Sequence, residues 1–306
     1  MILYSVGGLF CWLTSVQQCK LKKRHQLNRA DCTENMKAVI LAAGYGTRLN
    51  RDLQNDSSGR FKHLCGIPKP LLPVGNKALI SHWMAALDKI DSIDEVYVIT
   101  NDLYYVKFEE WAKEFQLVKV LNDGTKSNEE RLGAIACLQL AITQFNINDH
   151  VLILGGDTLF YEDFSLSVVL ARFAELQSIN CDSNLVLSYL CKDEETTKFG
   201  ILETDEKFQV TAFKEKPRST ETTSRRACPC FYIYSKNTIP LIAKFLQEKQ
   251  NSPLEEKDAP GNFLHWVYSR KPVFVHQVCG RFDVGNLPSY IDCTTYFQKH
   301  RNELLI

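Results

Sequence analysis

The sequence predicts an α/β fold in which a mixed, mostly parallel sheet is sandwiched between helices. Short apolar runs at residues 39–41, 95–100 and 151–154 are typical of strands that lie buried within such a sheet. Amphipathic segments at 79–90 and 103–115 separate these runs and are expected to be helices. Strands that alternate with helices in this way build a sheet covered on both faces.

Beyond residue 184 the expected strands become shorter. They lie at 185–190, 200–202, 208–213, 231–234 and 273–278. No internal repeat or low-complexity linker divides the chain. We therefore expect a single domain over residues 36–306, in which the half at 184–306 extends the sheet of the half at 36–183.

A turn rich in small residues follows the first expected strand, with the sequence AAGYGTR at residues 42–48. Glycines there let the backbone approach a polyanion and direct its N–H groups towards it. Arg48 and the later Lys69 would neutralise phosphate charge from the side. The turn lacks the Gly-Lys-Ser/Thr ending of a P-loop and the third glycine of a dinucleotide fingerprint. A glycine turn needed only for geometry is the alternative, but the combination favours a nucleoside triphosphate.

Asp157 is a candidate metal ligand. It comes directly after the expected strand at 151–154 and two glycines, at the carboxyl end of a strand, where open α/β sheets bind ligands. A carboxylate suits Mg²⁺, which takes oxygen ligands and keeps some of its water. By itself, a Gly-Gly-Asp sequence after a strand is often only a turn.

Seven short motifs occur along the chain in one order: LAAGYGTRL at 41–49, KPLLPV at 69–74, RLGA at 131–134, GGD at 155–157, FGILE at 199–203, EKP at 215–217 and FDVG at 282–285. In this order they resemble the nucleotidyltransferases that make nucleotide sugars, the relatives of glucose-1-phosphate thymidylyl- and uridylyltransferases and mannose-1-phosphate guanylyltransferases. The resemblance runs from about residue 36 to 297. It implies the Rossmann-like, GT-A-like fold of nucleotide-diphospho-sugar transferases.

The resemblance also implies a reaction: a nucleoside triphosphate and a sugar 1-phosphate give a nucleotide sugar and pyrophosphate, by in-line attack at the α-phosphorus. Such a transfer depends on positioning and charge neutralisation, because the attacking phosphate is already a nucleophile. The half at 36–183 would then bind the nucleotide and the half at 184–306 the acceptor.

Residue roles follow from the matching motifs. The catalytic residues would be Arg48, Lys69 and Asp157, with Arg48 and Lys69 on the outer phosphates. The nucleotide-binding residues would be Leu41, Ala42, Ala43, Gly44, Gly46, Thr47, Asn128 and Gly133. The acceptor-binding residues would be Gly200, Glu215 and Lys216, with Glu203 a weaker candidate. Asp157 and Asp283 would together bind Mg²⁺.

Three features leave alternatives open. Asn128 would either contact the base or cap the following helix. The polar segment at 50–66 is either a solvated loop or a mobile lid over the triphosphate, and we lean towards the lid. Cys230 stands where relatives usually have a glycine, so its side chain would either narrow the sugar pocket or redirect it to a different acceptor.

Two other functions are weighed against sugar-phosphate transfer. One is a cytidylyltransferase for phosphocholine or another small phosphate, but the GILE and EKP elements favour a sugar. The other is a catalytically silent regulator that binds nucleotide sugars, but Asp157 and Asp283 are both retained. A GT-A glycosyltransferase is disfavoured because no Asp-x-Asp follows the central strand.

The composition limits the partners. The 306 residues are 45% apolar and hold 36 basic and 36 acidic side chains, so the charge disfavours nucleic-acid binding. Eleven scattered cysteines without a Cys-x-x-Cys pair suggest reduced thiols and a cytoplasmic location. Homo-oligomerisation is left open.

Residues 1–35 are expected to be an extension outside the fold. Their apolar run at 9–16 is shorter than the roughly 20 residues that span a bilayer, so no stable membrane insertion is expected. The basic residues follow the run instead of preceding it, which disfavours a signal peptide. A weak mitochondrial or membrane-surface role is the lesser alternative.

Overall fold

The computed structural model describes residues 35–161 and 164–299, which belong to one compact unit over 35–306. Apart from Asn35, the extension expected at 1–35 lies outside the described residues. The strands are β1 (Met36–Leu41), β2 (Pro73–Val74), β3 (Lys77–Ala78), β4 (Ile93–Thr100), β5 (Val118–Asn122), β6 (His150–Gly155), β7 (Thr158–Phe160), β8 (Asn184–Leu190), β9 (Gly200–Thr204), β10 (Val210–Glu215), β11 (Arg226–Cys228), β12 (Phe231–Tyr234), β13 (Val273–Gln277) and β14 (Arg281–Asp283).

The α-helices are α2 (Thr47–Asn55), α3 (Leu79–Leu87), α4 (Tyr105–Ala112), α5 (Ala134–Gln144), α6 (Leu166–Ile179), α7 (Pro240–Glu248), α8 (Pro260–Val267) and α9 (Leu287–Lys299). Short 3-10 turns lie between them: η1 (Lys62–Leu64), η2 (Lys69–Leu71), η3 (Asn128–Glu130), η4 (Asp193–Lys198) and η5 (Leu254–Glu256). Every strand and helix proposed from the sequence is present, with ends that differ by a few residues.

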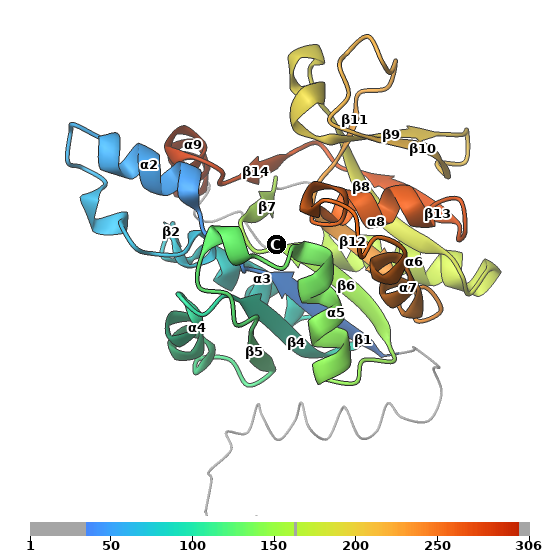
Figure 1. Ribbon diagram of the computed structural model, residues 1–306, viewed down its shortest axis with the longest axis horizontal. Helices are drawn as coiled ribbons and strands as arrows, with labels where there is room; N and C mark the ends of the chain where they lie inside the picture. The colour runs from blue at the N-terminus through green and yellow to red at the C-terminus, as the bar shows by residue number, and fades with distance from the viewer. Residues whose placement is uncertain (1–34, 162–163, 300–306) are drawn as a thin grey trace, which may run out of the picture. The chain divides into compact units, whose positions relative to one another are not determined.

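The central sheet has the order β10-β9-β11-β8-β12-β6-β1-β4-β5, and β13 also pairs with β8. β1 lies in its parallel part, between β4 and β6. Beyond β6 the pairing is mostly antiparallel, and β9, β10 and β11 stand out at the top of Figure 1. The sheet is thus mixed, and most of its strands run in the same direction.

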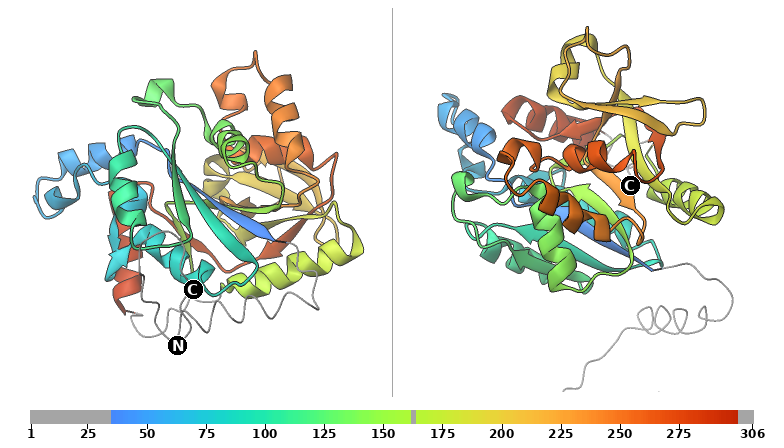
Figure 2. Two further views of the ribbon diagram at one scale, coloured as in Figure 1. Left: turned by 90° about the horizontal axis from the view of Figure 1, so that it is seen from below. Right: turned by 45° about the vertical axis from the view of Figure 1, so that its right-hand side comes forward.

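Helices cover both faces of the sheet, as Figures 1 and 2 show. β1 shows how the sequence produces this arrangement, because successive side chains of a strand point to opposite faces. Ala38 and Ile40 pack in the core on the side of α3, α4, α6 and α9, whereas Val39 packs with α5, α7 and α8. Both cores are apolar at β1, so its residues 38–41 are all apolar.

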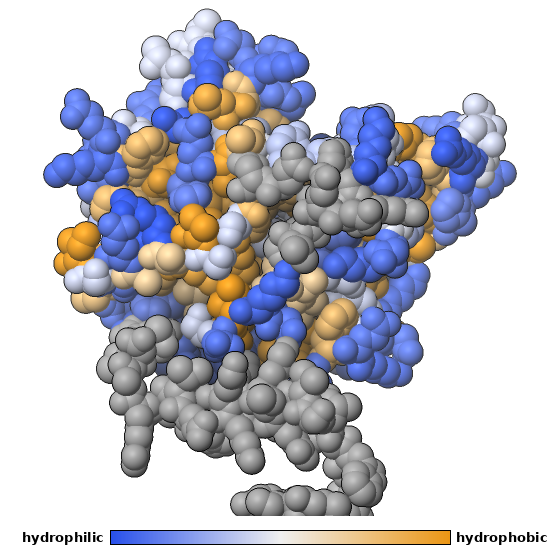
Figure 3. All heavy atoms as spheres, turned by 180° about the vertical axis from the view of Figure 1, so that it is seen from behind, coloured by the Kyte–Doolittle hydropathy of each residue, from blue (hydrophilic) through white to orange (hydrophobic). Residues whose placement is uncertain are grey.

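The segment at 50–66 is helical in part, and its residues 56–61 form a non-helical connection. Its first part belongs to α2, which buries Leu49 and Leu53 one turn apart, and η1 follows. Asp52 on α2 accepts a hydrogen bond from the backbone N–H of Leu287 at 3.2 Å, which ties α2 to the start of α9. The projecting end of α2, at the upper right of Figure 3, carries mostly hydrophilic side chains. Within the described ranges, no helix is both long and apolar enough to cross a membrane.

Candidate active site

Hydrogen bonds fix the backbone of the small-residue turn after β1. The N–H of Ala42 donates to Ile99, at 2.8 Å, and the Asn101 side chain donates to the carbonyl of Ala43, at 2.9 Å. Gly46 adopts a φ of 63°, which favours glycine, and α2 begins at the next residue. No side chain of the described residues caps α2, so its first N–H groups and Arg48 in its first turn are available to an anion.

Lys69 is brought to this turn by a close approach at Gly156. The N–H of Gly156 donates to the carbonyl of Leu41 at 2.9 Å. A methyl group at Gly156 would lie 2.9 Å from Cγ of Pro70, so only glycine lets the segment after Lys69 pass here. Lys69 consequently lies beside Gly46 and forms an ion pair with Asp157, with 3.4 Å between Nζ and Oδ2.

Asp157 and Asp283 are brought together by the small two-stranded sheet of β7 and β14. Asp283 is the register partner of Thr158, and the N–H of Val284 donates to the carbonyl of Asp157 at 3.0 Å. Arg48 approaches from α2, since its Nη2 lies 3.7 Å from the Cβ position of Gly285. The structure therefore gathers Arg48, Lys69 and the two carboxylates from four separate segments.

The electrostatics of the two carboxylates favour a cation. Burial raises the pKa of Asp157, and the charge of Asp283 raises it further, whereas Lys69 and Arg281 act in the opposite direction. Two close carboxylates fit a hard divalent cation, because its charge offsets their repulsion. No group of three or more His, Cys, Asp or Glu side chains suited to a metal occurs in the described part of the chain. A bound ion would take its other ligands from substrate oxygens and water.

Arg281 is a charged residue that the motif analysis missed. Its Nη1 lies 2.9 Å from Oδ2 of Asp283, and its guanidinium lies over the rings of Tyr189 and Phe199, at 5.6 and 5.0 Å from their centres. Burial alone would lower its pKa, but Asp283 and Tyr189 raise it above the usual value. The sequence does contain a signal for Arg281, because residues two apart on a strand share a face and Arg281 therefore lies on the same face as Asp283.

The predicted acceptor residues meet on the hairpin of β9 and β10. Gly200 and Glu215 are cross-strand partners, and a methyl group at Gly200 would lie 2.3 Å from the Phe213 ring. Gly261, at the start of α8, closes over the same carboxylate, so burial raises the pKa of Glu215. Lys216 follows with a φ of 49°, which is uncommon for a side chain with a Cβ atom.

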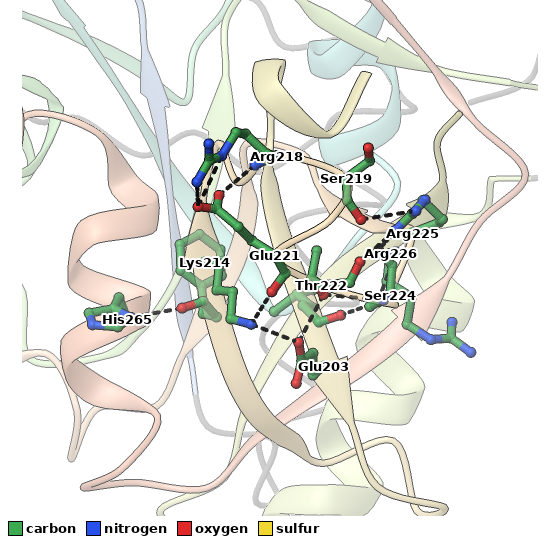
Figure 4. A network of polar contacts seen from close by, with 12 residues as sticks. Glu203, Lys214, Arg218, Ser219, Glu221, Thr222, Ser224, Arg225, Arg226 and His265 are labelled. Atoms are coloured by element: carbon green, nitrogen blue, oxygen red, sulfur yellow. Dashed lines mark hydrogen bonds and ion pairs between the residues drawn. The ribbon is translucent and has the colours of Figure 1, made fainter. Parts of the chain in front are cut away.

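Glu203 lies on the other face of this hairpin, away from Glu215. Its carboxylate accepts a hydrogen bond from the Thr222 hydroxyl at 2.8 Å and pairs with Lys214 at 3.4 Å (Figure 4). The alternation of side chains along β9 explains the difference, because Gly200 and Glu203 are an odd number of residues apart. Glu203 therefore belongs to an outer polar network instead of the acceptor side.

Two thiols lie between the carboxylate pair and Glu215. Cβ of Cys230 lies 3.0 Å from the Cβ position of Gly155, at the end of β6. Burial and then the charge of Asp157 raise the pKa of Cys230, and burial raises that of Cys228 to about 12. Both side chains are only partly buried and are neutral thiols at neutral pH.

The base-side candidates lie before and at the start of α5. Gly133 has a φ of 90° and a methyl group there would lie 2.9 Å from Cα of Asp258. Asp258 accepts hydrogen bonds from the N–H of Ala134 and from Arg131 Nε, at 3.1 and 3.2 Å. Asp258 thus accepts the first backbone N–H of α5. The capping alternative for Asn128 is wrong, because the Asn128 side chain does not cap α5.

The segment before Asn128 is joined to the phosphate turn. The Tyr45 hydroxyl, between the two glycines of the turn, lies 2.8 Å from the Thr125 hydroxyl, which in turn donates to Asp123. The structure thus sets the 122–128 segment beside the turn after β1, at the carboxyl ends of β4 and β5.

The chain belongs to the nucleotidyl transferase family, whose model matches residues 37–300. It is 25% identical over 278 residues to a glucose-1-phosphate thymidylyltransferase from Neisseria meningitidis, covering 87% of this chain and 84% of that protein. It is 26% identical over 284 residues to a glucose-1-phosphate adenylyltransferase from Geobacillus stearothermophilus, covering 87% of this chain and 67% of that one. The homologues are thus sugar-1-phosphate nucleotidyltransferases, and the predicted family is confirmed.

A solved structure of apo UDP-glucose pyrophosphorylase has the same fold. Its TM-score is 0.65 at 17% identity, and the match covers 87% of this chain and 99% of that one. The expected nucleotide-diphospho-sugar transferase fold is therefore confirmed.

Proposed function

We propose that this protein transfers a nucleotidyl group from a nucleoside triphosphate to a sugar 1-phosphate, with release of pyrophosphate. The observation that carries the proposal is the convergence of Arg48, Lys69, Asp157 and Asp283 at the carboxyl ends of β1 and β6. Two cations and two carboxylates are what charge neutralisation of a phosphoryl transfer requires. The names of the relatives support a sugar phosphate as the acceptor.

On the nucleotide side, the backbone from Leu41 to Thr47 would cradle the phosphates. Arg48 and Lys69 would neutralise the outer phosphates and the departing pyrophosphate. Asn128 and Gly133 would lie beside the base, whose identity we leave open. Lys69 already has a counter-charge in Asp157, 3.4 Å away, so its ammonium is held in place before the nucleotide binds.

On the acceptor side, Glu215 would accept hydrogen bonds from sugar hydroxyls and Lys216 would bind the sugar phosphate. Gly200 would contact the sugar through its backbone, and its missing side chain leaves room for the Phe213 ring. An acceptor phosphate oxygen forms a bond to the α-phosphorus while the bond to the bridging oxygen of the β-phosphate breaks in line. No general base is needed, because the attacking phosphate is already ionised.

Asp157 and Asp283 would hold Mg²⁺, which supplies positive charge for the reacting phosphates. The donor set fits such an ion, since each side chain offers hard carboxylate oxygens. The cytoplasmic location stays a prediction.

Neither alternative function gains support from the site. The relatives named above act on sugar phosphates, so phosphocholine is not the favoured acceptor. A silent nucleotide-sugar regulator would not need the paired carboxylates that lie together here.

The test is pyrophosphate release by the full chain with Mg²⁺ across nucleoside triphosphates, sugar 1-phosphates, sugar-alcohol phosphates and phosphocholine. We expect acceptor-dependent release that is lost in Asp157→Asn. Asp182→Asn, which removes a surface carboxylate paired with Lys271, is the matched control and should keep activity. Absence of release together with a nucleotide-sugar-dependent thermal shift would instead favour the silent regulator.

A further inference from the structure

Arg281 is a buried cation whose hydrogen-bonding capacity is not fully used. Its side chain is only 8% exposed, and its Nε has no acceptor in the part of the molecule that the structure describes. Buried polar groups without partners are costly, and a guanidinium offers five donors. Tyr189 and Phe199 hold the plane of the guanidinium in place, so it cannot turn to water to satisfy the missing bond.

Arg281 hydrogen-bonds to Tyr189, and its charged partner is a candidate metal ligand. Nη1 lies 2.9 Å from Oδ2 of Asp283, and Lys69 makes the equivalent contact with Asp157, at 3.4 Å. Each carboxylate therefore has its own internal cation. A divalent ion that binds Asp157 and Asp283 competes with these cations for the same oxygens, so each released cation needs a new anion.

The position of Arg281 indicates which anion this is. Lys69 belongs to the side of the phosphate turn, where a triphosphate would bind. Arg281 lies on the opposite side: its guanidinium covers Phe199, whose carbonyl accepts the N–H of Lys216 at 3.1 Å, and Gly200 comes next in the chain. An anion that meets Arg281 next to Asp283 therefore arrives from the acceptor side.

We propose that Arg281 is the internal counter-ion of Asp283 in the free protein and binds the phosphate of the acceptor once a cation occupies Asp283. This inference rests on the proposed function, because that function supplies the phosphorylated acceptor. The guanidinium fork matches a phosphate, which can accept two parallel N–H bonds. Arg281 thereby makes acceptor binding depend on the cation.

The first experiment measures Mn²⁺ binding to the free full-length protein by electron paramagnetic resonance, without nucleotide. Arg281→Met removes the competing charge and should tighten Mn²⁺ binding about tenfold or more, since one opposite charge near a carboxylate shifts proton affinity by a similar factor. Arg270→Met is the matched control: Arg270 also covers an aromatic ring, Trp266, and faces a carboxylate, Glu248, outside the site. Unchanged or weaker Mn²⁺ binding in Arg281→Met would show that Arg281 only orients Asp283 and would overturn the proposal.

The second experiment uses inorganic phosphate as the probe of the acceptor side. Phosphate is titrated calorimetrically into the protein with Mn²⁺ and a non-hydrolysable nucleoside triphosphate present to fill the triphosphate side. We expect binding that weakens at least tenfold in Arg281→Met and is largely restored in Arg281→Lys, which also shows that loss of folding is not the cause. Equal phosphate binding in wild type and Arg281→Met would overturn the acceptor role. Neither the Mn²⁺ titration nor the phosphate titration needs turnover. A failure of the proposed transfer reaction is therefore distinguished from a failure of the proposed role of Arg281.

Discussion

Replacing Gly156 by alanine tests the packing that brings Lys69 to Asp157. The added methyl would lie 2.9 Å from Cγ of Pro70 and 3.0 Å from the carbonyl oxygen of Leu41. A proline ring and the backbone of a central strand are stiff, so the Lys69 segment itself has to shift. We expect overpacking to cost about 1–3 kcal/mol of unfolding free energy. For a domain of this size that corresponds to a fall of several °C in Tm.

The transfer rate of Gly156→Ala should fall by more than its loss of unfolding free energy alone would cause. A displacement of the Lys69 ammonium of about 1 Å is expected to reduce the transfer rate roughly 100-fold. Circular-dichroism melting and pyrophosphate release are measured together. Ile242→Val is the control, because it removes one methyl group from a fully buried position on α7 and should cost about 1 kcal/mol without touching the site. Wild-type melting and wild-type release by Gly156→Ala would refute the reasoning.

Three further changes have distinct outcomes. Burial and a neighbouring carboxylate raise the pKa of Asp157, so the stability that its protonated form gives at low pH is lost as the pH rises through its folded pKa. Asp157→Asn should therefore raise Tm at pH 7 but not near pH 3. A lower Tm of this variant at pH 7 would contradict the reasoning. Asp52→Ala removes the carboxylate that accepts the Leu287 N–H and should cost about 1 kcal/mol in urea unfolding, whereas Asp52→Asn, which keeps a side-chain acceptor, should cost much less. Arg225→Ala removes donors to three carbonyls of the 219–224 loop beside the acceptor hairpin. The KM for the acceptor should therefore rise while the KM for the nucleotide stays unchanged. Equal rises in both KM values would contradict a local role.

The elements that the sequence predicted well are those with a strong local pattern. β1, β4 and β6 are continuous apolar runs because helices cover both of their faces. The sequence pattern does not distinguish α2 from a polar segment, because only Leu49 and Leu53 are apolar within this helix. Their spacing of four residues was the available signal, and it is weak in so short a helix.

The site could be predicted only in part, because its geometry depends on contacts between distant segments. β7 and β14 have three residues each, too few for a recognisable period, yet their pairing is what brings Asp283 to Asp157. The bond between Arg131 and Asp258 likewise joins residues far apart in sequence, and no local pattern indicates it. The glycines gave the best local signal, since Gly156 and Gly200 occur where another segment passes too closely for a side chain.

The pairing of β14 with β7 also bears on how the protein is made. The phosphate turn, Lys69 and Asp157 are all synthesised well before Asp283, which follows later in the chain. A ribosome-bound chain can therefore form the parallel part of the sheet and the turn after β1 while it still lacks Asp283. Among the strands of the described residues, β14 comes last in the chain and brings Asp283 to Asp157, so the proposed cation site can form only after Asp283 has been synthesised.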